Sequence, residues 1–142
     1  MKILVIDDEK NIRHTLRGIL EDEGYEALTA ETGEEGLGLL QQDPCELVFL
    51  DVKLPGIDGL EVLKRVRQQF ASTEVVMISG HGDIRTAVEA VKKGAVDFLV
   101  KTVTISRVTI TARNVAGRLR LGQLKQQKGE DPPGRYRMSR ET

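Results

Sequence analysis

The sequence predicts an α/β fold in which a doubly wound, five-stranded parallel sheet lies between two layers of helices. Short apolar runs alternate with segments whose apolar residues recur every three or four positions, as strands and helices do in such folds. Because parallel strands share one carboxyl edge, where such folds bind ligands, the polar residues that end four of these runs are expected to converge. The runs end as follows: 3–6 in Asp7-Asp8-Glu9, 48–50 in Asp51, 75–78 in Ser79, and 96–100 in Lys101.

The first two strands are each followed by a helix. The first strand, over residues 2–6, precedes a helix with apolar residues at helical spacing that stops at Gly24. Residues 25–30 form a second strand, whose lower apolar content suits an edge of the sheet. The following helix opens with Thr32 and Glu35, spaced as in a capping box, and ends before the next proline.

The third strand, residues 47–50, is strongly apolar and leads through a loop rich in proline and glycine into another helix. Asp58 stands three residues before Glu61, which is again a capping pattern. We therefore interpret Asp58 as a helix cap in preference to a catalytic carboxylate.

A fourth strand over residues 75–78 precedes a helix over residues 84–93. We expect Ala87, Val88 and Val91 of this helix to face inward, and Gly94 to stop it. The fifth strand covers residues 96–100. A strand order of 2-1-3-4-5, as in flavodoxin-like three-layer sandwiches, places the acids of the first and third strands side by side.

A fifth helix follows Lys101, although its first residues are mostly β-branched and favour helix weakly. Apolar residues recur at helical spacing, and burial of such a face normally outweighs propensity. These residues are Ile105, Val108, Ala112, Val115 and Leu119. We expect residues 1–121 to form one domain and residues 122–142 to be a polar, basic linker or tail that is disordered.

The composition excludes several classes of protein. No apolar run approaches the roughly 20 residues of a membrane span, and the amino terminus lacks the features of a secretory signal, so a cytoplasmic protein is expected. A single cysteine and two histidines argue against disulfides and zinc. Residues 1–101 carry 12 basic and 19 acidic residues, a net charge of -7, whereas residues 102–142 carry 9 and 3, a net charge of +6. Such an acidic body would repel nucleic acid.

The converging side chains suggest phosphoryl chemistry. Asp7, Asp8 and Asp51 would repel one another unless a hard cation joined them, and Mg²⁺ fits best. Asp51 could then accept a phosphoryl group, with Lys101 and Ser79 supplying an ammonium and a hydroxyl to its oxygens.

At these residues the sequence resembles the receiver domains of two-component response regulators. The resemblance covers residues 1–101 closely and the fifth helix loosely, and it is strongest for receivers of enhancer-binding activators that work with an alternative sigma factor. The matching segments are Val5-Ile6-Asp7-Asp8-Glu9, Leu50-Asp51-Val52-Lys53-Leu54-Pro55-Gly56-Ile57-Asp58-Gly59, Ile78-Ser79-Gly80-His81-Gly82 and Asp97-Phe98-Leu99-Val100-Lys101.

The resemblance implies a phosphorylation-dependent switch in which a sensor histidine kinase phosphorylates Asp51. It also implies that Asp8, Asp51 and the main-chain carbonyl of Lys53 ligate Mg²⁺, with Asp7 assisting through water. Ser79 and Phe98 would be the switch residues, coupling the phosphoryl group to the surface of the last two helices and last strand. That surface would control an output, expected to be transcription through an attached domain or the transcription machinery, and could form a homodimer.

Two features depart from the family pattern: Thr102 follows Lys101 where proline, often cis, is usual, and the fifth helix has Thr and Ile in place of Leu and Arg. Phe98 also has a plain interpretation as a core residue, and Gly80 and Gly82 could simply shape a turn. The alternative function is an aspartate-nucleophile phosphatase or phosphotransferase. Such an enzyme needs a carboxylate two residues after its nucleophile, where this chain has Lys53.

Overall fold

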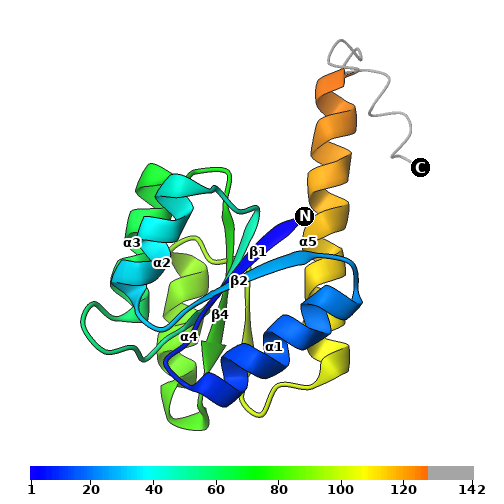
Figure 1. The fold of residues 1–142 in the computed structure, drawn as a ribbon. Helices are drawn as coiled ribbons and strands as arrows, with labels where there is room; N and C mark the ends of the chain where they lie inside the picture. Colours follow the sequence, from blue (N-terminus) through cyan, green and yellow to red (C-terminus); the bar gives the residue numbers. More distant parts are fainter. Residues whose placement is uncertain (128–142) are drawn as a thin grey trace.

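The parallel sheet has the strand order β2-β1-β3-β4-β5, as predicted (Figure 1). The computed structural model describes residues 1–127. Its strands are β1 (Lys2–Ile6), β2 (Glu26–Ala30), β3 (Leu47–Asp51), β4 (Glu74–Ser79) and β5 (Asp97–Val100). Its helices are α1 (Lys10–Asp22), α2 (Gly33–Gln42), α3 (Gly59–Gln69), α4 (Ile84–Lys92) and α5 (Ile105–Gln127), with a short 3-10 helix, η1 (His81–Asp83), before α4.

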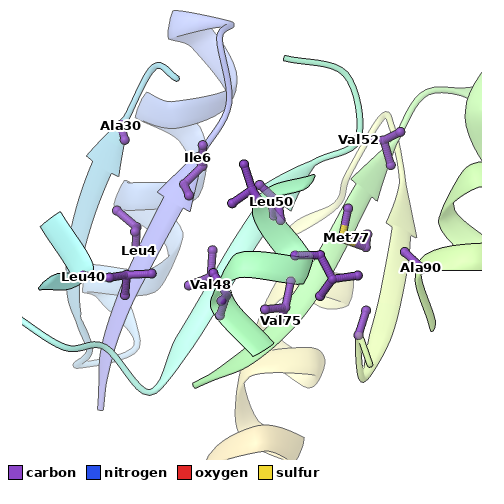
Figure 2. Close-up of a cluster of buried hydrophobic side chains, with 14 of the residues drawn as sticks. Leu4, Ile6, Ala30, Leu40, Val48, Leu50, Val52, Val75, Met77 and Ala90 are labelled. Carbon is purple, nitrogen blue, oxygen red and sulfur yellow. The ribbon is translucent and has the colours of Figure 1, made fainter. Parts of the chain in front are cut away.

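Two hydrophobic cores lie on opposite faces of the sheet, because side chains alternate along each strand. One core packs α2, α3 and α4 against the face that carries Leu4, Val48 and Met77 (Figure 2). The other packs α1 and α5 against the face that carries Ile3 and Phe49. The three-layer sandwich predicted from the alternating pattern is thus confirmed.

The strand register brings the carboxyl ends of the central strands level with one another. Ile6 of β1 pairs with Leu50 of β3, and Ser79 of β4 pairs with Val100 of β5. Ladder-like hydrogen bonds continue past the strands, since the Lys101 amide donates to the Ser79 carbonyl at 2.8 Å. The ladder between β4 and β5 therefore extends by one residue, to Lys101.

Side-chain caps begin α2 and α3 where the sequence predicted them. The Thr32 hydroxyl accepts from the Glu35 amide at 3.0 Å, and Asp58 Oδ1 accepts from the Glu61 amide at 2.9 Å. Neither capping box is fully reciprocal: Glu35 reaches the Glu31 amide, one residue before the cap, and Glu61 pairs with a neighbouring arginine of α3. Asp58 thus has the structural role expected of it.

The predicted inward face of α4 is partly wrong. Ala87 is buried as expected, but Val88 and Val91 are 41% and 38% exposed, and Ala90 takes the inward position instead (Figure 2). Small alanine side chains let this helix lie close to the sheet, which leaves the larger valines on its outer side. The helix therefore presents an apolar outer stripe that also includes Ile84.

Helix α5 confirms most of the periodicity of its sequence: Val108, Ala112 and Val115 are buried, and Leu119 is partly buried against the same core. The expected burial of Ile105 is wrong, because this first residue of the helix is 68% exposed. The helix continues to Gln127, past residue 122, where the linker was expected to begin. Residues 121–127 are mostly Leu, Gln and Lys, which are good helix formers, and the next proline comes later. Figure 1 shows the C-terminal part of α5 projecting beyond the sheet. The rest of the predicted tail, residues 128–142, lies outside the described residues.

Among the helices of residues 1–127, none has the length and apolar character that a bilayer crossing requires.

Candidate functional site

Three carboxylates gather at the carboxyl edge of the sheet, where β1 and β3 lie side by side. Asp7 and Asp8 follow β1, and Asp51 is the last residue of β3. One carboxylate oxygen of each lies within 4.8 Å of the others. Asp7 and Asp51 are buried, whereas Asp8 is exposed at the rim. The cluster predicted from strand order is therefore present.

Lys101 reaches this cluster from the end of β5. Its Nζ lies 3.2 Å from Asp51 Oδ2, 3.4 Å from Asp7 Oδ2 and 3.5 Å from Glu9 Oε2. The peptide bond between Lys101 and Thr102 is cis. With Thr102 as the next residue, the Lys101 ammonium group lies within reach of three carboxylates.

Asp7 is the most deeply enclosed member of the cluster. Its Oδ1 accepts a hydrogen bond from the Glu9 amide at 2.8 Å, but its Oδ2 is buried with no hydrogen-bond partner among the described residues. Burial raises the pKa of Asp7 to about 7; the Glu9 amide opposes this rise and the Asp51 charge adds to it. Without a bound cation, Asp7 is thus difficult to ionise.

Burial also raises the pKa of Asp51, although the nearby Lys101 ammonium and the Lys53 amide lower it in part. For Lys101 the balance is reversed. Burial acts to lower its pKa, but attraction to Asp51, Asp7 and Glu9 outweighs burial, so its pKa lies above the usual value. One ammonium group is therefore shared among more carboxylates than it can neutralise.

Ser79 and Phe98, the predicted switch residues, lie on β4 and β5. Ser79 is completely buried, and its hydroxyl donates to the Gly80 carbonyl at 2.7 Å. Phe98 is partly buried and packs against the core on the α2, α3 and α4 face. The Ser79 hydroxyl is thus bonded to the next residue of the loop that follows β4. The Phe98 ring makes the contacts expected of a core residue.

Lys53 lies near the start of the loop from β3 to α3, and its amide donates to Asp51 Oδ1 at 3.2 Å. The side chain of Lys53 is 81% exposed and approaches Asp83, in η1, at 4.0 Å. Gly59 closes the loop by donating to the Val52 carbonyl at 3.0 Å. A Cβ at Gly59 would collide with the Asp51 carbonyl oxygen and come within 2.8 Å of Val52 Cα. Only glycine therefore fits where the two ends of the loop meet.

Two residues at the site had no role assigned from the sequence, although Glu9 was expected to reach this edge of the sheet. Glu9 occupies the N-cap position of α1 without capping it, and its side chain turns to Lys101 instead. Arg13 Nη1 donates to the Asp7 carbonyl at 2.8 Å and so holds the end of β1. Glu9 follows two aspartates in the sequence, which is a usable signal, whereas nothing in the pattern around Arg13 indicates its contact. His14 and His81 are both exposed.

The residues present fit a hard divalent cation. Carboxylate oxygens are the ligands that Mg²⁺ prefers, and a cation could bind Asp7 Oδ2, which accepts no hydrogen bond among the described residues and lies 3.4 Å from Lys101 Nζ. It would also relieve the repulsion among Asp7, Asp8 and Asp51 that Lys101 relieves only in part. The donor set contains no histidine or cysteine, so it does not resemble a zinc site.

The fold and site together define a class: a flavodoxin-like α/β domain with an acidic pocket and a lysine at the carboxyl edge of its sheet. The chain belongs to the response regulator receiver domain family, whose family model matches residues 3–113. The resemblance found in the sequence is confirmed.

Similar proteins include curated regulatory proteins. The chain is 43% identical over 121 residues to the nitrogen assimilation regulatory protein NtrX of Azorhizobium caulinodans, covering 84% of this chain and 27% of that one. It is 40% identical over 111 residues to the alginate biosynthesis transcriptional regulatory protein AlgB of Pseudomonas aeruginosa, covering 78% and 25%. The chain thus spans about a quarter of the length of these curated relatives.

Solved structures agree with the fold. The receiver domain of NtrX from Brucella abortus superposes with a TM-score of 0.77 at 43% identity, covering 80% of this chain and 96% of that domain. A response regulator receiver domain protein from Clostridium thermocellum superposes with a TM-score of 0.80 at 35% identity, covering 84% and 97%.

Proposed function

We propose that this receiver domain is a phosphorylation-dependent switch in which Asp51 accepts a phosphoryl group from a histidine kinase. The observation that carries the proposal is the position of Asp51: a buried carboxylate within 4.8 Å of two others and 3.2 Å from the Lys101 ammonium. A carboxylate oxygen of Asp51 would form the new bond to phosphorus as the bond to the donor nitrogen breaks.

Asp7, Asp8, Asp51 and the Lys53 carbonyl would hold Mg²⁺. When bound, the ion neutralises charge on the phosphoryl oxygens and lowers the barrier to transfer. Lys101 would supply a second cation, and its ammonium group already contacts Asp51. The Ser79 hydroxyl would have to leave the Gly80 carbonyl in order to donate to a phosphoryl oxygen.

The exchange of this hydrogen bond gives the switch two states. Ser79 pairs with Val100 of β5, and Phe98 lies two residues earlier on the same strand, paired with Met77, so a movement of Ser79 would reach Phe98 along β5. We propose that Phe98 then alters the surface of α4, β5 and α5, where Val88 and Val91 are exposed. That surface would form a homodimer or engage an attached output domain that controls transcription in the cytoplasm, without direct nucleic acid binding by this domain.

Incubation with acetyl phosphate, with and without Mg²⁺, tests the assignment. Intact mass spectrometry should show a gain of one phosphoryl group that requires Mg²⁺, decays slowly and disappears in Asp51→Asn. Metal-dependent modification that persists in Asp51→Asn would refute the role of Asp51. Rapid turnover of small phosphoesters would instead favour the phosphatase interpretation. The sequence argues against that interpretation, because such an enzyme needs a second carboxylate at position 53, where this chain has lysine.

A further inference from the structure

Glu34, in the first turn of α2, contacts the loop that joins β3 to α3. Its Oε2 accepts a hydrogen bond from the Ile57 amide at 3.3 Å. A Cβ built on Gly56 would lie 2.7 Å and 3.0 Å from the two carboxylate oxygens of Glu34. Gly56 has a φ of 73°, a conformation that favours glycine. The carboxylate therefore lies directly against the backbone of the loop.

This loop has few other hydrogen bonds to hold its shape. Among the described residues, the loop amides that have a partner between residues 53 and 58 are those of Lys53 and Ile57. The first is bonded to Asp51 and the second to Glu34. One end of the loop is thus fixed by a residue of the acidic cluster, and the other end by α2.

Helix α2 is a firm anchor for this contact. Its N-terminus is capped by Thr32, and α2 lies beside α3 on one face of the sheet (Figure 1). A Cβ added at Gly33 would stand 2.9 Å from Ile57 Cγ1, so the start of α2 is packed tightly against the same loop. A carboxylate at a helix N-terminus is also favoured by the helix dipole.

We propose that Glu34 is a positioning residue for the cation site, which it serves by holding the 53–58 loop in the shape that presents the Lys53 carbonyl. The inference rests on the proposed function, because it assumes that this carbonyl ligates Mg²⁺. Glu34 does not touch the reacting groups. Because Glu34 holds the loop in place beforehand, the loop loses less conformational entropy when the cation binds.

The neighbouring Glu35 provides a matched control. It lies in the same helical turn with the same charge, but its carboxylate bonds the Glu31 amide at 2.8 Å instead of the loop. Glu34→Ala and Glu35→Ala each remove one carboxylate and one hydrogen bond from the start of α2. Only the first frees the loop.

The full chain is titrated with MgCl₂ while amide resonances are followed by NMR, and amide exchange with deuterium is measured without metal. Glu34→Ala should raise the Kd for Mg²⁺ about fivefold and speed exchange of the Ile57 amide to a similar extent, as expected for the loss of one hydrogen bond. Glu35→Ala should leave both within about twofold of wild type.

Equal Mg²⁺ affinity in the Glu34→Ala and Glu35→Ala chains would overturn the positioning role while leaving the proposed function intact. A wild-type chain whose amide resonances do not respond to Mg²⁺ would overturn the proposed cation site, and the inference with it. An unchanged exchange rate of the Ile57 amide in Glu34→Ala would show that the contact does not hold the loop, and would also refute the inference.

Discussion

Replacing Asp7 by asparagine should stabilise the metal-free domain, and more so at high pH. Asp7 is completely buried, and its pKa of about 7 in the folded protein lies well above its ordinary value of 3.8. The folded state therefore holds this proton more tightly than the unfolded chain does. The stabilisation from the proton is complete below about pH 4 and is lost as the pH rises through about 7.

The magnitude follows from the difference between the two pKa values. At 1.36 kcal/mol per unit, a rise of about three units makes the ionised Asp7 cost roughly 4 kcal/mol at pH 8. Asparagine keeps the oxygen that accepts from the Glu9 amide and removes the charge. We expect Asp7→Asn to raise the free energy of unfolding by up to this amount at pH 8 and by little at pH 4.5.

Thermal and urea unfolding in EDTA at the two pH values measure this difference. A gain of about 4 kcal/mol corresponds to a rise in Tm of roughly 10 to 15 °C for a domain of this size. Asp8→Asn is the matched control, because Asp8 belongs to the same cluster but is exposed, so its effect should be small. A stability difference between wild type and Asp7→Asn that is independent of pH would refute the reasoning.

Three further predictions concern the rest of the structure. Mg²⁺ at 100 times its Kd should raise the free energy of unfolding by about 2.7 kcal/mol; calorimetry should show most of this gain lost in Asp51→Asn, and an unchanged gain would contradict the site. Gly59→Ala should destabilise the domain by at least ~2 kcal/mol, because the new methyl group meets the backbone of Asp51 and Val52. A neutral effect in urea unfolding would argue against this close backbone contact. Thr32→Ala should cost about 1 kcal/mol through the lost cap of α2, whereas Thr29→Ala makes the same change within β2, where the residue caps no helix; equal losses would count against the capping role.

The sheet and its site could be predicted because both depend on short-range patterns. Uninterrupted apolar runs identify buried parallel strands, and the residues that follow them must then meet at one edge. Asp7, Asp51 and Lys101 are placed in this way, which is why their contacts agree with the sequence. The cap at Asp58 is equally local, since it depends on a residue only three positions away.

Features that depend on packing or side-chain orientation could not be predicted in the same way. Hydrophobicity alone cannot tell that Ala90 of α4 faces the sheet while Val88 faces outward, because the choice depends on how closely the helix approaches. The contact of Glu34 with Ile57 joins residues 23 positions apart, and no local signal marks it. The direction of the Ser79 hydroxyl is likewise a rotamer choice that sequence does not encode.

The length of α5 has a mechanical consequence. With 23 residues and a rise of 1.5 Å per residue, the helix is a rod of about 34 Å, and its contacts with the core on this face of the sheet run from Val108 to Leu119. A change in the tilt of such a helix moves its C-terminal end further than its N-terminal end. A tilt of about five degrees at its base would carry Gln127 through roughly 3 Å. A small change at the carboxyl edge of β5 would therefore become a large displacement at the far end of the helix.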